Sequence, residues 1–489
     1  MMKKTAACVR RALLSTASNV SVFVTAAFFV TGLLVLGPYV WWREYIDMLE
    51  RYIIIPWGMA LCLLRLDRRA AREEESVRWD LWILFALLVW LVVPFAIRFG
   101  NTFNNAGSWH NSAVTFFGLY ALTTEETAQR REKLFDLASL LFAVCSVALG
   151  CCLLYCVATV QKFGEDEFAF GVCNGIYLCA NGHYNTSGMV AVCAALMSLA
   201  GVCRLSCKPV RALCLLGCVL MTVVTVLTQS RTARYALIIA YAVGVYGLLA
   251  ANARMKRAWV RHAAGLLAAV VTAGAGYVLA DTMNNAVIAH YNRTAQLRAE
   301  TADAKTVPQV LALVTAAAAE ETETDTKTEA PAAQLEAREA VDASFSGRTA
   351  IWRNLLNRWK ESPKYFLIGY GVGRIGRQVT ENTIHEGREG VSIHNGYLQY
   401  IADYGMIGFA LLCAFFALLT PGVVRVFYAR GGRQKPGYRV LCMMGLACLI
   451  CGMMESSPLG AMSPMNMMLF YALALLSSRD RDMKTCKGA

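Results

Sequence analysis

Long runs of apolar residues recur along the chain, each at the length that a helix needs to cross a membrane. A transmembrane helix takes about 20 such residues to span roughly 30 Å of hydrocarbon, and this pattern predicts about twelve spans. The clear runs are residues 20–40, 81–97, 137–160, 188–202, 212–227, 236–250, 263–279, 398–419, 440–454 and 462–476. Two shorter runs, 53–64 and 112–122, fit either a span or a re-entrant helix. The pattern therefore predicts an all-α, polytopic membrane protein.

The composition agrees with this class, and the charges give the protein an orientation. With 57% hydrophobic and 17% charged residues, the chain is too apolar for a soluble domain. If both short runs cross, the Lys and Arg clusters all fall on one side, which the positive-inside rule assigns to the cytoplasm. Those clusters lie at residues 3–11, 65–78, 130–133, 204–211, 254–261, 425–439 and 479–487. Both termini are then cytoplasmic, and the lack of a convincing cleavage site predicts that the first helix is retained.

One connection is large, and the same alternation places it on the outer side. It divides the chain into an N-terminal bundle of about nine helices at 1–280, a loop at 281–396 and about three C-terminal helices at 397–489. Within the loop, residues 299–340 are rich in Ala, Glu and Thr, which predicts a flexible insertion without chemistry. From residue 345 onward, aromatic residues and glycines favour a segment that folds against the membrane helices.

Most of the 18 cysteines lie within the apolar runs, where a small, soft side chain packs between helices. Only Cys173 and Cys179 fall in an outer connection. An oxidising compartment would let them pair, and their spacing permits a disulfide without requiring one. No spacing of Cys and His is typical of a zinc site, so the sequence predicts neither a metal nor another cofactor.

Three arginines on the outer side are candidates for binding an anion. Arg231 and Arg234, in QSRTARY, stand at the outer end of two neighbouring runs, and Arg348, in SGRTAIW, begins a segment with helical spacing. The guanidinium group suits phosphate oxygens, so a lipid-linked phosphate or diphosphate is the natural ligand. The alternatives are an anchor at headgroup depth for Arg231 and Arg234, and a solvated loop residue for Arg348.

His394, in SIHNGYLQYIADYGMIG, lies where the large loop re-enters the membrane. An imidazole can take a proton from a hydroxyl group, and Asn395 beside it could orient the ring or a sugar. The alternative is a structural histidine. The nearby glycines Gly371, Gly373 and Gly376 spell the dinucleotide-binding pattern, but that motif requires a βαβ unit. We interpret them, with Gly369, as a tight turn with close backbone packing.

Four motifs in order, SRTARY, GRTAIW, LIGYGVGRIG and IHNGYLQYIADYGMIGFALL, resemble the O-antigen ligase and polymerase superfamily of bacterial membrane glycosyltransferases. The resemblance covers roughly residues 229–419. It implies transfer of a glycan from undecaprenyl diphosphate to an acceptor hydroxyl on the periplasmic face of the inner membrane, without a metal or a nucleotide sugar. It also implies that His394 is the general base, that Arg231 and Arg348 bind the diphosphate, and that Arg234 is an auxiliary residue.

Within that superfamily three reactions stay open: ligation to a lipid A core in lipopolysaccharide biosynthesis, polymerisation of repeat units, and transfer to protein hydroxyls. We favour the ligase. A lipid-linked glycan transporter or flippase is the alternative from another class, and it predicts internal repeats and charged residues buried mid-membrane. The sequence contains no evident repeat and no evident charge in the middle of a run. A structural scaffold would leave the outer arginines and His394 without a role.

Overall fold

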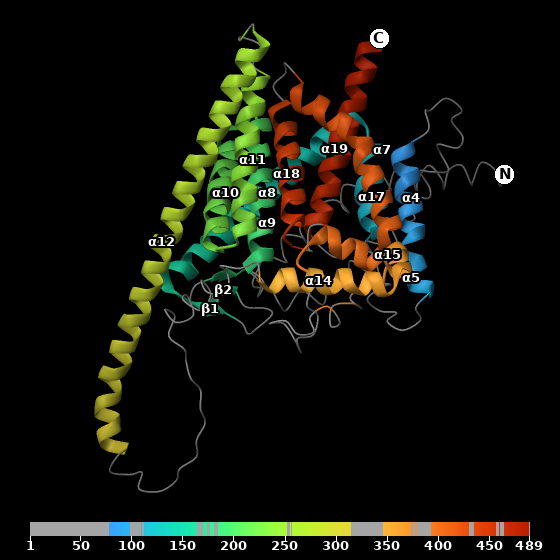
Figure 1. Ribbon diagram of the computed structural model, residues 1–489. Coiled ribbons are helices and arrows are strands. Elements are labelled where there is room, and N and C mark those ends of the chain that lie inside the picture. Colours follow the sequence, from blue (N-terminus) through green and yellow to red (C-terminus); the bar gives the residue numbers. More distant parts are fainter. Residues whose placement is uncertain are drawn as a thin grey trace, which may run out of the picture.

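The computed structural model describes residues 78–97, 109, 112–163, 170–173, 177–179, 184–251, 255, 257–313, 346–372, 375, 379, 393–429, 435–455, 459 and 464–488. This part of the chain is mostly helical, as predicted (Figure 1). Within it, six helices are long and apolar enough to cross a membrane, which makes the protein a plausible multi-pass membrane protein. The apolar runs at 20–40 and 53–64 lie outside the described residues, and the total of about twelve spans stays a prediction.

The six candidate spans are α8 (Ala128–Thr159), α9 (Tyr184–Arg204), α10 (Lys208–Leu227), α11 (Arg231–Ala250), α12 (Ala258–Leu313) and α17 (Gly396–Tyr428). The other helices are α4 (Trp79–Trp90), α5 (Val92–Ile97), the π-helix η2 (Val114–Ala121), α7 (Leu122–Glu125), α14 (Ser346–Glu361), α15 (Pro363–Ile368), α18 (Lys435–Gly452) and α19 (Pro464–Gly488). The short run at 112–122 therefore forms helical turns, which pack on α19.

Helix α9 is the centre of the bundle, where it packs against α8, α10 and α18. Its sequence is dominated by Gly, Ala, Ser, Cys and Val, and such small residues let neighbouring helices approach closely. The outermost helix, α12, has the opposite character. Its Leu266, Leu267 and Val270 are more than 60% exposed, as expected of a surface that faces lipid.

Helix α12 continues well beyond the apolar run that predicted it. It begins at Ala258, passes the expected boundary at residues 280–281 and ends at Leu313, so its last turns extend past the bundle (Figure 1). The division of the chain at residue 280 stays a prediction, and it falls inside this helix.

The prediction of an all-α fold missed a small antiparallel sheet. Three short strands, β1 (Lys162–Phe163), β2 (Phe170–Cys173) and β3 (Tyr177–Cys179), pair in the order β1-β2-β3 between α8 and α9. Strands of two to four residues are too short to show an alternating pattern in the sequence. The sheet lies at the same end of the bundle as α14 (Figure 1), and we refer to this end as the α14 end.

The opposite end, which we refer to as the C-terminal end, carries the last turns of α19 (Figure 1). Ion pairs there join helices that are distant in sequence. Arg204 of α9 binds Glu132 of α8, Arg131 of α8 binds Asp482 of α19, and Arg425 of α17 binds Asp480 of α19. Basic clusters that the sequence placed on one side thus meet at one end of the bundle. That this end faces the cytoplasm stays a prediction.

Candidate active site

The candidate site lies at the α14 end, where α17 begins. Asn395 is the N-cap of α17, because its side-chain oxygen accepts hydrogen bonds of 3.0 Å from the backbone N–H groups of Tyr397 and Leu398. Its amide nitrogen donates to the carbonyl of Met453 at 2.9 Å. Asn395 therefore ties the first turn of α17 to the end of α18. The auxiliary catalytic role predicted for Asn395 stays a prediction.

His394 directly precedes this cap and has a φ of +52°, in the left-handed region that residues other than glycine seldom adopt. The residue before it is held on both sides. The carbonyl of Ile393 accepts a 2.9 Å hydrogen bond from the indole of Trp352 in α14, and its N–H donates to the side chain of Gln399 at 3.0 Å. The unusual backbone conformation at His394 is thus maintained by contacts on either side of it.

A glycine allows α17 to approach α18 closely at this point. A Cβ atom on Gly396 would lie only 3.0 Å from the carbonyl oxygen of Glu455 and 3.1 Å from that of Gly452. Any larger residue at position 396 would push the two backbones apart. Gly396 therefore brings His394 next to the turn that carries Glu455.

Glu455 is the centre of the site, and its carboxylate is 5% exposed. One carboxylate oxygen, Oε1, accepts hydrogen bonds from Nη2 of Arg348 at 3.0 Å and from the side-chain amide of Asn185 at 2.9 Å. The other, Oε2, lies 3.5 Å from Nδ1 of His394. A buried carboxylate needs such partners, because an unpaired charge is costly away from water. Four elements thus meet at a single acidic group.

Arg348 reaches Glu455 from α14, which lies across the α14 end of the bundle (Figure 1). Its helix is fixed by Ile351, Leu355 and Trp359, which are buried in a cluster with Ile393 and Ile401 of the α17 region. The side chain of Arg348 remains 28% exposed although it is paired. A guanidinium group carries five N–H donors, so a paired arginine with this exposure can still bind an anion from outside.

Arg231 and Arg234 begin α11, whose N-cap is Ser230. The turn before α11 contains Thr228 and Ser230, and Gly188 of α9 packs against both of them. Gly188 lies one helical turn along α9 from Asn185. Arg231 is therefore at the same end of the bundle as Glu455, and it is exposed. Arg234 is partly buried, with its guanidinium 5.5 Å from the ring of Tyr235. The structure brings His394 and Arg348 together at Glu455, whereas neither Arg231 nor Arg234 contacts Glu455 among the interactions described.

The predicted glycine turn lies beside a break in α17. Gly369 and Gly371 have positive φ angles of 83° and 84°, and Gly405 of α17 has a φ of 74° that interrupts the helix. The backbone N–H of Gly371 donates to the carbonyl of Asp403 at 3.0 Å, so the turn packs directly on the break. This confirms the close backbone packing predicted for Gly369 and Gly371, while Gly373 and Gly376 lie outside the described residues. The buried Asp403 precedes the break, so it belongs to the first, separate segment of α17.

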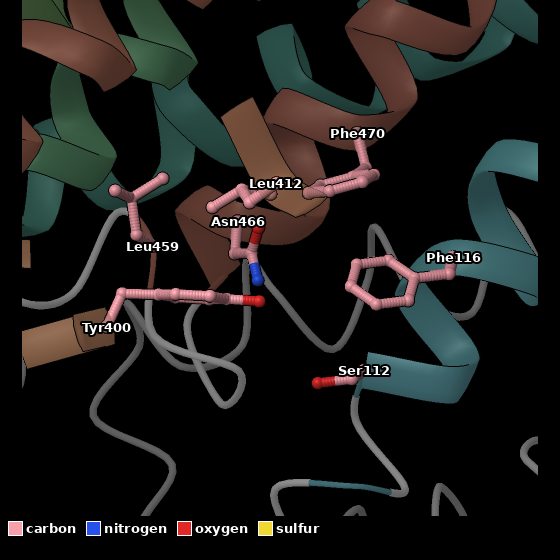
Figure 2. Close-up of a pocket in the computed structure, with 7 residues that line it drawn as sticks. All are labelled: Ser112, Phe116, Tyr400, Leu412, Leu459, Asn466 and Phe470. Atoms are coloured by element: carbon pink, nitrogen blue, oxygen red, sulfur yellow. The ribbon is translucent and has the colours of Figure 1, made fainter. Parts of the chain in front are cut away.

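A small pocket lies beneath the start of α17 (Figure 2). Polar groups of Ser112, Tyr400 and Asn466 line it together with the apolar side chains of Phe116, Leu412, Leu459 and Phe470. Figure 2 shows the side chains of Tyr400 and Asn466 close to one another in its wall. The pocket has room for about one water molecule.

Two residues of the site, Glu455 and Asn185, were absent from the sequence-based candidates. Glu455 had a detectable signal, since it is an acidic residue directly after the apolar run of α18. Asn185 had a weaker one, a place in the polar segment NGHYNTSG. His183 and His385 lie outside the described residues. Within the described ranges, no three His, Cys, Asp or Glu residues are grouped so that they could hold a metal ion.

The fold and the site define a multi-pass helical membrane protein with a polar cluster at one end of its bundle. Residues 216–413 match the family model described as O-antigen ligase, which confirms the resemblance of this region to the O-antigen ligase and polymerase superfamily. No curated protein matches the chain. The matched region includes Arg231, Arg234, Arg348 and His394, whereas Asn185 and Glu455 lie outside it.

Proposed function

We propose that this protein is a ligase-type glycosyltransferase that moves a glycan from undecaprenyl diphosphate to an acceptor hydroxyl at the α14 end of the bundle. The single observation that carries the proposal is that His394 and Arg348, which come from different elements, both contact the carboxylate of Glu455. A general base and an anion-binding arginine are the two groups that such a transfer needs close together.

In the proposed reaction, His394 takes the proton of the acceptor hydroxyl through Nε2. The acceptor oxygen then forms a bond to the anomeric carbon of the glycan, and the bond from that carbon to the diphosphate oxygen breaks. Glu455, 3.5 Å from Nδ1, orients the ring and stabilises the imidazolium that forms. This arrangement gives the carboxylate a positioning role, because it acts through His394.

The leaving diphosphate gains negative charge as its bond to the glycan breaks. Arg348 is placed to bind it, since its guanidinium is partly exposed beside the imidazole. Arg231 supplies a second guanidinium at the same end, and Arg234 an auxiliary one. Two arginines fixed in advance could stabilise that charge as the reaction proceeds, and the chemistry would then require no metal or other cofactor.

The acceptor defines the branch of the family, and polymerisation of repeat units or transfer to a protein hydroxyl are the alternatives to ligation. We propose the inner membrane of a bacterium as the location, with both termini in the cytoplasm and the α14 end in the periplasm. Reporter domains fused to the C-terminus, one active only in the cytoplasm and one only in the periplasm, test this orientation. Activity of the periplasmic reporter at the C-terminus would reverse it.

A lipid-linked glycan transporter is the rival from another class. Transport needs a path through the middle of the bundle, where charged or polar groups bind the substrate. The central helix α9 is instead packed with small apolar residues along most of its length. The charged residues cluster at the two ends, which favours chemistry at one end over passage between them.

The decisive experiment measures glycan transfer from an undecaprenyl diphosphate donor to a lipid A core, to a glycan repeat unit and to a protein, using purified full-length enzyme. We expect transfer by wild type and a collapse in His394→Ala and Arg348→Ala. The acceptor that works identifies the branch.

Two variants serve as matched controls. Arg358→Ala removes an arginine from the same helix as Arg348, where it makes an exposed contact with Glu361, and His262→Ala removes a histidine at the start of α12. Both should transfer at the wild-type rate when membrane abundance is equal. Wild-type rates in His394→Ala and Arg348→Ala would show that the site is misassigned, and failure of wild type with every donor and acceptor would favour the transporter.

A further inference from the structure

The small sheet at the α14 end brings two cysteines together. In the antiparallel pairing of β2 with β3, Cys173 is opposite Tyr177 and Gly171 is opposite Cys179. Because side chains alternate along a strand, Cys173, Tyr177 and Cys179 present their side chains to the same face, and Cys173 and Cys179 are diagonal neighbours there. Both cysteines are buried, at 6% and 2% exposure, and they pack together in one small cluster with Tyr177 and Tyr184.

The environment of the pair suits thiol–disulfide exchange. The neighbouring thiol of Cys179 lowers the pKa of the Cys173 thiol, and the nearby ammonium of Lys162 acts in the same direction. The same contact raises the pKa of Cys179. One cysteine thus supplies the thiolate that attacks a disulfide, while the other remains as the thiol that completes the exchange.

The pair is also connected to the candidate active site. Tyr177, between the two cysteines, stacks on Tyr184 with ring centroids 4.6 Å apart. Tyr184 is the first residue of α9, and the next residue, Asn185, donates the 2.9 Å hydrogen bond to Glu455. The position of the β2–β3 hairpin therefore bears on the position of Asn185 at the site.

We propose that Cys173 and Cys179 form a disulfide that fixes the β2–β3 hairpin and, through it, the start of α9 at the active site. The oxidant is a disulfide-bearing oxidoreductase of the outer compartment. The Cys173 thiolate attacks its disulfide and releases one oxidant thiol; Cys179 then loses its proton and displaces the second. The protein loses two electrons and two protons, and the oxidant gains them as a dithiol. The proposal rests on the periplasmic orientation in the proposed function, but not on the transfer reaction.

A third cysteine lies near the pair and offers an alternative disulfide linkage. Cys156, near the end of α8, is close enough to the sheet that a Cβ atom on Gly171 would lie 3.2 Å from its sulfur. Cys156 is buried, and it comes from a different element. Cys173 and Cys179 are diagonal neighbours on one face of the hairpin and pack together, which favours their pairing over either pairing with Cys156.

Peptide mapping tests the linkage directly. Full-length protein is taken from its native membrane, free thiols are blocked with N-ethylmaleimide under acid quench, and chymotrypsin is used because it cleaves after Phe170, Tyr177 and Tyr184. We expect the peptides GVCNGIY and LCANGHY to be found joined, and to separate on reduction. Alkylation of both thiols, or linkage of either to Cys156, would overturn the proposal.

Transfer assays test the connection to the site. The variants Cys173→Ser, Cys179→Ser and the double variant should each lower transfer by the same factor, roughly threefold to tenfold, the range that one hydrogen bond contributes. Cys151→Ser, an exposed cysteine of α8, is the control and should match wild type. Wild-type rates in the double variant would refute the positioning role. A mapped disulfide in an enzyme without any transfer activity would refute the proposed function and leave the disulfide standing.

Discussion

Each end of the bundle holds an arginine against buried or half-buried carboxylates, but the number of carboxylates for each cationic side chain differs between the two ends. At the C-terminal end, the side chain of Arg204 is 1% exposed and is bound by two carboxylates, those of Glu132 at 2.5 Å and Asp136 at 2.8 Å. At the α14 end, Arg348 is 28% exposed and shares the single carboxylate of Glu455 with His394. The first cation is fully neutralised, whereas the second retains capacity for an anion.

This difference distinguishes a cluster that stabilises the fold from a cluster that is accessible to a ligand. The C-terminal cluster also contains the hydroxyl of Tyr438, which donates to Glu132 at 2.7 Å, and the ring of Phe135, 4.3 Å from the Arg204 guanidinium. It joins α8, α9 and α18 and exposes little to a ligand. The cluster around Glu455 also joins several elements, but its cation and its imidazole stay partly exposed, at 28% for Arg348 and 20% for His394. Substitutions should therefore affect stability at one end and activity at the other.

The largest effect is expected from Arg204→Ala. Removing this cation takes the guanidinium away from Glu132 and Asp136, and breaking a buried ion pair costs about 3–5 kcal/mol of folding free energy. Thermal unfolding in detergent should show a strongly lowered transition temperature. A transition within a few degrees of wild type would mean that the C-terminal cluster contributes little to the fold.

Next in size is Arg348→Ala, which should lower kcat/KM for transfer by about 10²–10³-fold, the loss typical when a preorganised charge partner is removed. Its unfolding temperature should fall less than that of Arg204→Ala, because Arg348 is partly exposed and Glu455 keeps its contacts with Asn185 and His394; Arg358→Ala is measured in parallel. Lysine at position 348 should restore only part of the activity, because it cannot offer two parallel donors to a diphosphate. Equal losses of stability in Arg348→Ala and Arg204→Ala would remove the contrast between the two ends.

Much of this contrast could be predicted from sequence, and the features that could not be predicted were missed for physical reasons. The apolar runs coincide with six helices that are long and apolar enough to cross a membrane, because length and hydrophobicity alone define such a helix. Arg348 and His394 were predicted as candidates from their position at the outer side. Glu455 and Asn185 were not, since their roles depend on how α9 packs against α18, which no local pattern encodes. The extension of α12 was missed for a different reason, because a change from apolar to polar residues ends a span but does not end a helix.

A smaller effect is expected from Glu455→Gln, which keeps the shape of the side chain but removes its charge. Charge-assisted hydrogen bonds contribute about 1.5–3 kcal/mol, so transfer should fall roughly 10–100-fold. The measurement is kcat/KM at fixed pH, with Glu361→Gln on the exposed side of α14 as the control. Glutamine at 455 that transfers as fast as wild type would show that the carboxylate is merely a packing group.

The smallest effects, on KM for the donor, are expected at the two arginines of α11, and they should differ in size. Arg231→Lys should raise KM for the diphosphate-linked donor a few fold, about 1 kcal/mol, because the exposed guanidinium is expected to bind phosphate oxygens. Arg234→Lys should change it less, since that side chain is partly buried against Tyr235. Donor titrations of the two variants check this order. A larger effect at Arg234 would mean that Arg234 is the main residue that binds the diphosphate and that Arg231 is the auxiliary one.

The central claim is that Glu455 unites His394 with Arg348 in one active site, and a double-mutant cycle tests it most directly. It requires kcat/KM for transfer in wild type, His394→Ala, Glu455→Gln and the double variant. The account predicts that most of the cost of Glu455→Gln disappears once His394 is alanine, because the carboxylate acts largely through that ring. An equal cost in both backgrounds would contradict the account, since Glu455 would then act independently of His394.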